Sequence, residues 1–74
     1  MQITISLHGV FRIGRFKKKN LEYPAGSRAG DAIEDLQIPP DLLGIVLING
    51  KHATAEQELR DGDLLMLLPL LEGG

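Results

Sequence analysis

The chain has 74 residues, no cysteine and a formal net charge of −2 at pH 7. This length allows one domain, and the lack of cysteine excludes disulfides, a thiolate nucleophile and iron–sulfur clusters. The two histidines, His8 and His52, have no neighbours at ligand spacing, so we expect no metal site. No segment approaches the ~20 apolar residues of a membrane span and no signal peptide opens the chain. We therefore expect a cytoplasmic protein without a membrane partner.

The first seven residues, MQITISL, alternate strictly between apolar and polar side chains. This period of two predicts a half-buried strand. The next segment, HGVFRIGRF, contains two glycines and predicts a loose turn. KKKNLEY then predicts a second, partly exposed strand, whose lysines also protect an open sheet edge from unwanted pairing.

A single helix is expected within PAGSRAGDAIEDLQIPP. Three apolar residues at the spacing i, i+4, i+7 share one face of it: Ala29, Ile33 and Leu36. Either Ser27 caps the start, or the helix starts later at Asp31, with Glu34 at capping-box spacing. Pro39-Pro40 ends the helix, because proline lacks a backbone donor and restricts the residue before it.

Residues 45–48 form a short apolar run that is followed by Asn49-Gly50. Asn-Gly favours the positive φ angles of a type I′ turn, so we predict a hairpin whose second strand begins at Lys51. The segment AEQELRDGD then predicts a short helical turn over residues 56–59 and a tight turn at Asp61-Gly62.

The last strand is LLMLL, residues 64–68, and Pro69 is expected to end its pairing. The order of elements predicts an α+β fold with one helix packed on one sheet. Because LLMLL does not alternate, we expect this strand to be central and buried on both faces. One helix covers only one face. Either the sheet curls to close its second face, or Leu65 and Leu67 form an exposed patch that, with Pro69, meets a partner.

The sequence ends on LLPLLEGG, which is either a frayed end, a cloning remnant or a functional arm. Residues 69–74 reach roughly 20 Å when extended, at ~3.3–3.6 Å per residue, and two glycines fit a narrow channel. A terminal carboxylate with a pKa of about 3.3–3.7 is ionised at neutral pH and can attack a nucleotide α-phosphate in another protein's ATP site. We therefore expect a domain over 1–69 and a flexible tail over 70–74, made of Leu70, Leu71, Glu72, Gly73 and Gly74.

Four motifs, in this order, resemble the second half of the MoaD/ThiS-type ubiquitin-like sulfur carriers. They are an apolar strand with Asn-Gly at 46–50, Asp-Gly-Asp at 61–63, an apolar strand with proline at 64–69, and Gly73-Gly74. Residues 1–7 and 27–38 match the first strand and the helix of that family more loosely. Leu70 and Leu71 depart from it, since the family often has a second proline or a small residue after the strand.

The resemblance implies a β-grasp fold, with one mixed sheet of four to five strands and one main helix. It also implies a non-catalytic carrier that binds no cofactor itself. A ubiquitin-activating-type enzyme would use ATP to adenylate Gly74, which is then converted to a thiocarboxylate. The sulfur would pass to a synthase subunit in the biosynthesis of molybdopterin, thiamine thiazole or a related product. An enzyme in its own right is not expected, because the chain offers no cysteine, phosphate loop or paired-histidine site.

The basic segment 12–19 suggests an alternative function. Six of the eight cations lie within residues 1–28, whereas residues 29–74 hold nine of the ten acids. Aromatic residues are interleaved with these cations, namely Phe11, Phe16 and Tyr23 with Arg12, Arg15 and Lys17 to Lys19. Such a combination can bind single-stranded nucleic acid, so the alternative is a β-grasp RNA-binding or regulatory interaction domain. The pI of about 5.5 is far below that of nucleic-acid modules, so we favour a charged edge and expect no nucleic-acid partner.

Overall fold

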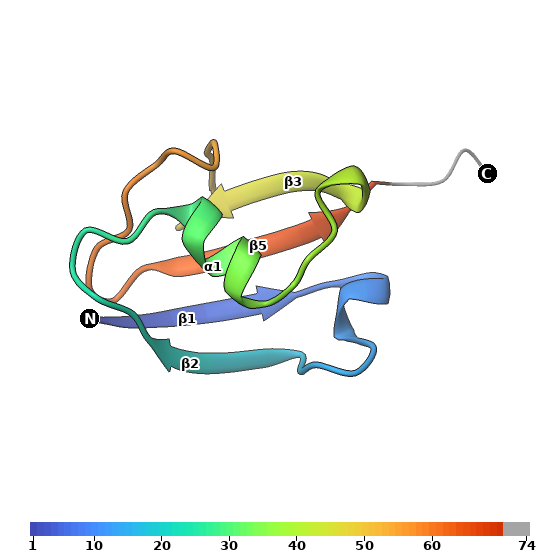
Figure 1. Ribbon diagram of the computed structural model, residues 1–74, viewed down its shortest axis with the longest axis horizontal. Coiled ribbons are helices and arrows are strands. Elements are labelled where there is room, and N and C mark those ends of the chain that lie inside the picture. The colour runs from blue at the N-terminus through green and yellow to red at the C-terminus, as the bar shows by residue number, and fades with distance from the viewer. Residues whose placement is uncertain (71–74) are drawn as a thin grey trace.

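The computed structural model describes residues 1–70, which form one sheet with one helix across its face (Figure 1). The elements are β1 (Gln2–Leu7), the 3-10 turn η1 (Gly9–Arg12), β2 (Lys18–Glu22), α1 (Ala29–Asp35), the 3-10 turn η2 (Pro40–Leu42), β3 (Leu43–Ile48), β4 (Lys51–His52) and β5 (Leu64–Pro69). The strand order is β2-β1-β5-β3-β4. β1 and β5 are parallel, and the other neighbours are antiparallel. The predicted α+β fold, with one mixed sheet and one main helix, is confirmed.

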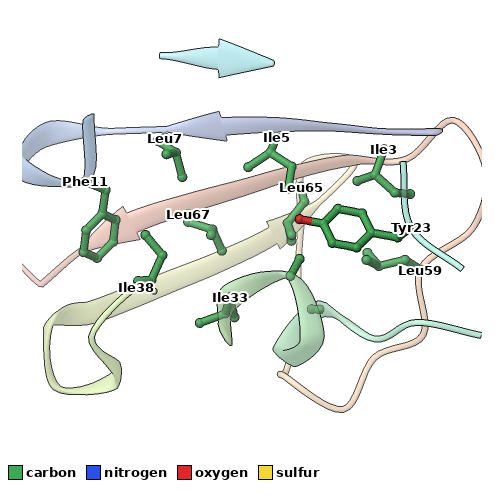
Figure 2. Close-up of a cluster of buried hydrophobic side chains, with 12 residues drawn as sticks. Ile3, Ile5, Leu7, Phe11, Tyr23, Ile33, Ile38, Leu59, Leu65 and Leu67 are labelled. Carbon is green, nitrogen blue, oxygen red and sulfur yellow. The ribbon is translucent and has the colours of Figure 1, made fainter. Parts of the chain in front are cut away.

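The core lies between the sheet and α1, as Figure 2 shows. The apolar side chains of β1 point into it, because alternate residues of a strand share one face. Ile3, Ile5 and Leu7 are fully buried there, and Ile33 of α1 packs against them from the opposite layer. The predicted alternation of the first strand is therefore confirmed.

β5 is the central strand of the five, as its apolar sequence predicts. Leu65 and Leu67 are fully buried in the core beneath α1. The alternative in which these two residues form an exposed patch is therefore wrong. Their neighbours Leu64, Met66 and Leu68 point to the other face of the sheet, where they are half-buried. The expectation that β5 is buried on both faces is therefore wrong for this second face, which α1 does not cover.

The helix starts at Ala29, so neither predicted start is correct. Arg28 is the N-cap residue, and its backbone N–H donates to the Asp31 carboxylate at 2.8 Å. This carboxylate lies in the first helical turn, where it accepts from a backbone N–H that has no partner within the helix. Its negative charge also interacts favourably with the positive end of the helix dipole. The Ser27 hydroxyl instead donates to the Pro24 carbonyl at 2.8 Å and stabilises the preceding turn.

The turns differ in how well the sequence predicts them. Asn49 and Gly50 have φ angles of 53° and 83°, and β4 begins at Lys51, which confirms the hairpin. The helical turn over residues 56–59 is wrong. The turn lies earlier, where the Gln57 N–H donates to the Thr54 carbonyl at 3.1 Å. Glu58 instead forms an antiparallel bridge with Arg28, and the next residue, Leu59, is buried in the core. No helix within residues 1–70 is long and apolar enough to cross a membrane.

Candidate functional site

The candidate site is the end of the sheet at which β5 finishes and the predicted tail begins. η1 and η2 lie at this same end, whereas the N-terminus lies at the opposite end (Figure 1). η1 packs against β5, and a Cβ added to Gly9 would lie 3.1 Å from the Pro69 ring. Pro69, a predicted partner-binding residue, is half-buried in this packing. Leu71, Glu72, Gly73 and Gly74 lie outside the described residues.

The chain stays paired two residues beyond the predicted end of the strand at Leu68, and one residue beyond the predicted end of the domain. The Leu70 N–H donates to the Leu42 carbonyl at 2.7 Å. Pro69 therefore does not end the pairing, because proline lacks only its own N–H and the next residue donates again. The first residue of the predicted tail is thus hydrogen-bonded to the last residue of η2, with its side chain 55% exposed.

Gly44 makes this pairing possible. The β3–β5 register shifts between Leu43 and Ile45, so Gly44 occupies a bulge. A Cβ on Gly44 would lie 2.9 Å from the Leu70 nitrogen and 3.0 Å from the Pro69 oxygen, too close for any other residue without a backbone shift. The sequence interpretation missed this role. The signal was a glycine within an otherwise apolar strand, which marks a bulge or a close backbone approach.

An apolar rim surrounds this end of the molecule. Within residues 1–70, the large apolar side chains that are at least 40% exposed are Val10, Ile13, Leu42, Ile45 and Leu70. They belong to η1 and the residue after it, to η2, to the start of β3 and to the residue after β5. All five therefore lie at the end where the predicted tail begins. A cluster of exposed apolar side chains is typical of an interaction site, whereas single ones are common on any surface.

The rim continues onto the sheet face that α1 does not cover. Leu47 pairs with Met66, and Ile45 pairs with Leu68, so these side chains share that face. Leu47, Met66 and Leu68 are half-buried. Apolar contacts with a partner are therefore available from this face, whereas Leu65 and Leu67 on the opposite face are not accessible.

The basic segment does not form the stacking surface that RNA binding requires. Phe11 and Tyr23 are buried in the core, and only Phe16 is partly exposed. Arg12 and Arg15 are also engaged within the fold. The Arg12 Nε donates to the Leu7 carbonyl at 2.8 Å, and Arg15 donates to the carbonyls at the end of α1.

Arg15 ends the helix in a way that the sequence interpretation missed. Its Nε donates to the Leu36 carbonyl and its Nη2 to the Gln37 carbonyl, both at 2.8 Å. The last carbonyls of a helix lack partners within the helix, and a cation is favourable beside them. The two hydrogen bonds span 21 and 22 positions of the sequence, so no local pattern indicates them.

Asp61-Gly62-Asp63 is a structural turn at the other end of β5. The Asp63 carboxylate accepts from the Asn49 side-chain amide and from the Arg60 N–H, both at 2.8 Å. The Asn49 side-chain oxygen accepts from the Leu64 N–H at 2.9 Å. The two turn motifs thus bind each other and join the β3–β4 hairpin to the start of β5. No group of three or more potential metal-ligating side chains is present within residues 1–70.

The raised pKa of Tyr23 is explained by its surroundings rather than by a reaction. Burial of the phenol raises the pKa, and the hydrogen bond from its hydroxyl to the Asp35 carboxylate, at 3.0 Å, raises it further. The nearby carboxylate charge acts in the same direction. Tyr23 is therefore protonated at neutral pH, and its hydrogen bond to Asp35 joins the end of β2 to α1.

No protein-family model matches the chain. Its structure is similar to SAMP1 from Haloferax volcanii, with a TM-score of 0.80 and 21% identity over all of both chains. It is also similar to Urm1 from Trypanosoma brucei, with a TM-score of 0.72, 21% identity, and coverage of 99% of this chain and 95% of that one. A third similar chain comes from the complex of subunits 1 and 2 of the molybdopterin-converting factor from Helicobacter pylori, with a TM-score of 0.68 and 17% identity over all of both chains. These structures confirm the β-grasp, ubiquitin-like fold and, at the level of the fold, the resemblance to MoaD-type proteins.

Proposed function

We propose that this protein is a ubiquitin-like sulfur carrier whose reactive group is the Gly74 carboxylate. The observation that supports it best is the apolar rim around the point where β5 ends and the predicted tail begins. A partner that binds this rim would take the tail into its own active site. The chain is then a co-substrate and carries no catalytic residue of its own.

The chemistry needs two steps on the partner. A carboxylate oxygen of Gly74 attacks the α-phosphorus of ATP, which forms a carboxyl–phosphate bond and releases pyrophosphate. A sulfide nucleophile then attacks the acyl carbon, and AMP leaves with the oxygen that joined it. One carboxylate oxygen is thereby replaced by sulfur. Two glycines before the reactive carbon have no side chains to obstruct a narrow channel.

Two classes of partner follow from this proposal. The first is a ubiquitin-activating-type enzyme, which supplies the ATP site. The second is a sulfur-accepting synthase subunit, and the Helicobacter pylori neighbour, from a complex of two molybdopterin-converting factor subunits, supports this class. We place both reactions in the cytoplasm, where ATP is available. The pathway is of the molybdopterin or thiamine thiazole type.

The test is the intact mass of the full chain after incubation with a ubiquitin-activating-type enzyme, ATP and sodium sulfide. We expect the mass gain that corresponds to sulfur replacing one oxygen. The same incubation without ATP is the first control, and a chain lacking Gly74 is the second. An unchanged mass with several activating enzymes of this type, or the same gain without Gly74, would contradict the proposal.

A further inference from the structure

The outer edge of β2 carries backbone groups that the fold does not use. β2 is one of the two edge strands of the sheet, and β4 is the other. The Leu7 N–H donates to the Lys17 carbonyl, and Met1 and Tyr23 exchange hydrogen bonds through their backbones. In an antiparallel pair, bonded residues alternate with residues whose N–H and C=O point away. The backbone groups of Lys18, Asn20 and Glu22 therefore point outward, and Figure 1 shows β2 as the outermost strand.

Positive charge lies on both sides of this edge. Lys17, Lys18 and Lys19 are consecutive and exposed. Successive side chains of a strand point to opposite faces, so Lys18 lies on the uncovered face and Lys17 and Lys19 lie on the helix face. The Lys19 ammonium lies 5.9 Å from the centroid of the Phe16 ring, within cation–π distance.

A groove runs beside the edge on the helix face. Its volume is about 520 Å³, and its walls include Ile13, Phe16 and Lys19 on one side and Leu36 at the end of α1 on the other. Asp35 also lines the groove, and its carboxylate accepts from the Tyr23 hydroxyl. Apolar side chains and a lysine are thus available to alternate residues of any strand that pairs with β2. The groove would give such a strand side-chain contacts, while the edge would give it backbone hydrogen bonds.

We infer that the outer edge of β2 binds an extended acidic segment of another protein, which adds a strand to the sheet. The lysines select the partner. A second copy of this chain would bring two lysine-rich edges together, and that repulsion opposes self-pairing. An acidic segment instead gains attraction from the three lysines, which outnumber the two carboxylates beside this edge, Glu22 and Asp35. Nucleic acid fits less well, because two of the three aromatic side chains are buried in the core.

A capped peptide of alternating valine and glutamate tests this inference against the full chain labelled with 15N. We expect the amide signals of Lys18, Asn20 and Glu22 to shift and their hydrogen exchange to slow. The amides of Lys19 and Leu21 already face β1 and should change much less. The same peptide with lysine in place of glutamate is the charge control and should not bind.

Asn20→Pro removes one outward N–H without touching a hydrogen bond to β1. We expect the dissociation constant of the peptide to rise about tenfold, since a hydrogen bond and its geometry are lost. Asn20→Ala keeps the N–H and should bind as the unchanged chain does. A glutamate peptide N-methylated at alternate residues gives the same test without altering the protein, and it should bind about tenfold more weakly.

Four outcomes would overturn the inference: equal binding by Asn20→Pro and Asn20→Ala, equal binding by the N-methylated peptide, equal binding by the lysine peptide, or signal shifts confined to Val10, Leu42 and Leu70. A single-stranded oligonucleotide that binds the same residues regardless of Asn20→Pro would identify a phosphate site instead. The inference does not depend on the tail. A chain lacking Gly73 and Gly74 should still bind the peptide, although it should fail the sulfur assay.

Discussion

Gly44 shows how one missing side chain determines where the sheet ends. Its bulge lets Pro69 and Leu70 approach β3, and the Leu70 N–H reaches the Leu42 carbonyl. The last described residue of the chain is therefore held in a defined place beside η2. The direction in which the predicted tail starts depends on this contact.

The first prediction is that Gly44→Ala moves Leu70 away from β3. The added methyl group would lie 2.9 Å from the Leu70 nitrogen, so the backbone has to shift. Overpacking of this kind costs about 1–3 kcal/mol. We expect faster hydrogen exchange at the Leu70 amide and a lower urea midpoint of unfolding. Ile45→Ala is the control, because it shortens an exposed side chain next to Gly44 and keeps the backbone contact.

A second residue-scale prediction concerns Tyr23 at high pH. Burial first, and then the hydrogen bond to Asp35, raise its pKa above the unfolded value of about 10. The unfolded chain therefore loses this proton before the folded chain does. The contribution of Tyr23 to stability is complete below pH 10 and falls as the pH rises above it.

The measurement is the ultraviolet absorbance of tyrosinate, which reports on Tyr23 alone because the chain has one tyrosine. Without urea, we expect Tyr23 to ionise only as the chain unfolds at high pH. In urea, where the chain is already unfolded, Tyr23 should ionise near pH 10. Tyr23→Phe lacks the hydrogen bond to Asp35 and has no tyrosine, so its unfolding is followed by circular dichroism. The pH range of its unfolding should be set by other groups. A free titration near pH 10 in the folded protein would refute the assignment.

At the scale of elements, β5 contributes both to the core and to the uncovered face of the sheet. Leu65 and Leu67 are buried in the core, whereas Leu64, Met66 and Leu68 lie half-buried on the face that α1 does not cover. Its start is held by the Asn49–Asp63 contacts and its end by the Gly44 bulge. The strand is therefore fixed at both ends.

The third prediction compares two adjacent leucines of β5. Leu67→Ala removes a fully buried side chain, and such a change costs about 2–5 kcal/mol. Leu68→Ala removes a half-buried side chain from the open face and should cost about 1 kcal/mol. Urea unfolding of both variants measures the difference. Equal losses would mean that both faces are equally buried, against the structure.

At the scale of the whole molecule, the hydrogen-bonded turn motifs and the apolar rim lie at different ends. The turn motifs Asn49-Gly50 and Asp61-Gly62-Asp63 close the end near the N-terminus through side-chain hydrogen bonds. The other end carries the apolar rim and the start of the predicted tail. The rim side chains are therefore not among those that make the turn contacts.

The fourth prediction is that Leu42→Asp weakens recognition by the activating enzyme. The change places a charge in the apolar rim but keeps the carbonyl that accepts from Leu70. We expect KM for this chain to rise about tenfold in ATP–pyrophosphate exchange with kcat unchanged, since uniform binding is lost. Thr54→Asp, an exposed change in the loop at the other end, is the control and should leave KM unchanged. Equal effects of both changes would exclude the rim as the docking surface.

Local sequence patterns by themselves determined several features of this protein. The alternation in residues 1–7 is a property of neighbouring residues, and it correctly assigned each side chain of β1 to a face. The hairpin at Asn49-Gly50 also followed from local backbone preference. The order of the predicted elements indicated an α+β fold with one helix on one sheet, and the resemblance to the MoaD/ThiS-type sulfur carriers implied the β-grasp fold.

Only the tertiary structure decided which side chains are buried and which are exposed. A wholly apolar strand has no polar side to mark its outer face, so the sequence left open where Leu65 and Leu67 point, and register with β1 and β3 decided it. Phe11 directly precedes the basic segment 12–19, yet η1 places its side chain in the core. The Gly44 bulge and the Arg15 contacts join residues far apart in sequence. Periodicity and turn propensity act over a few residues, whereas burial depends on which distant segments meet, and this is why only the folded chain revealed the rim.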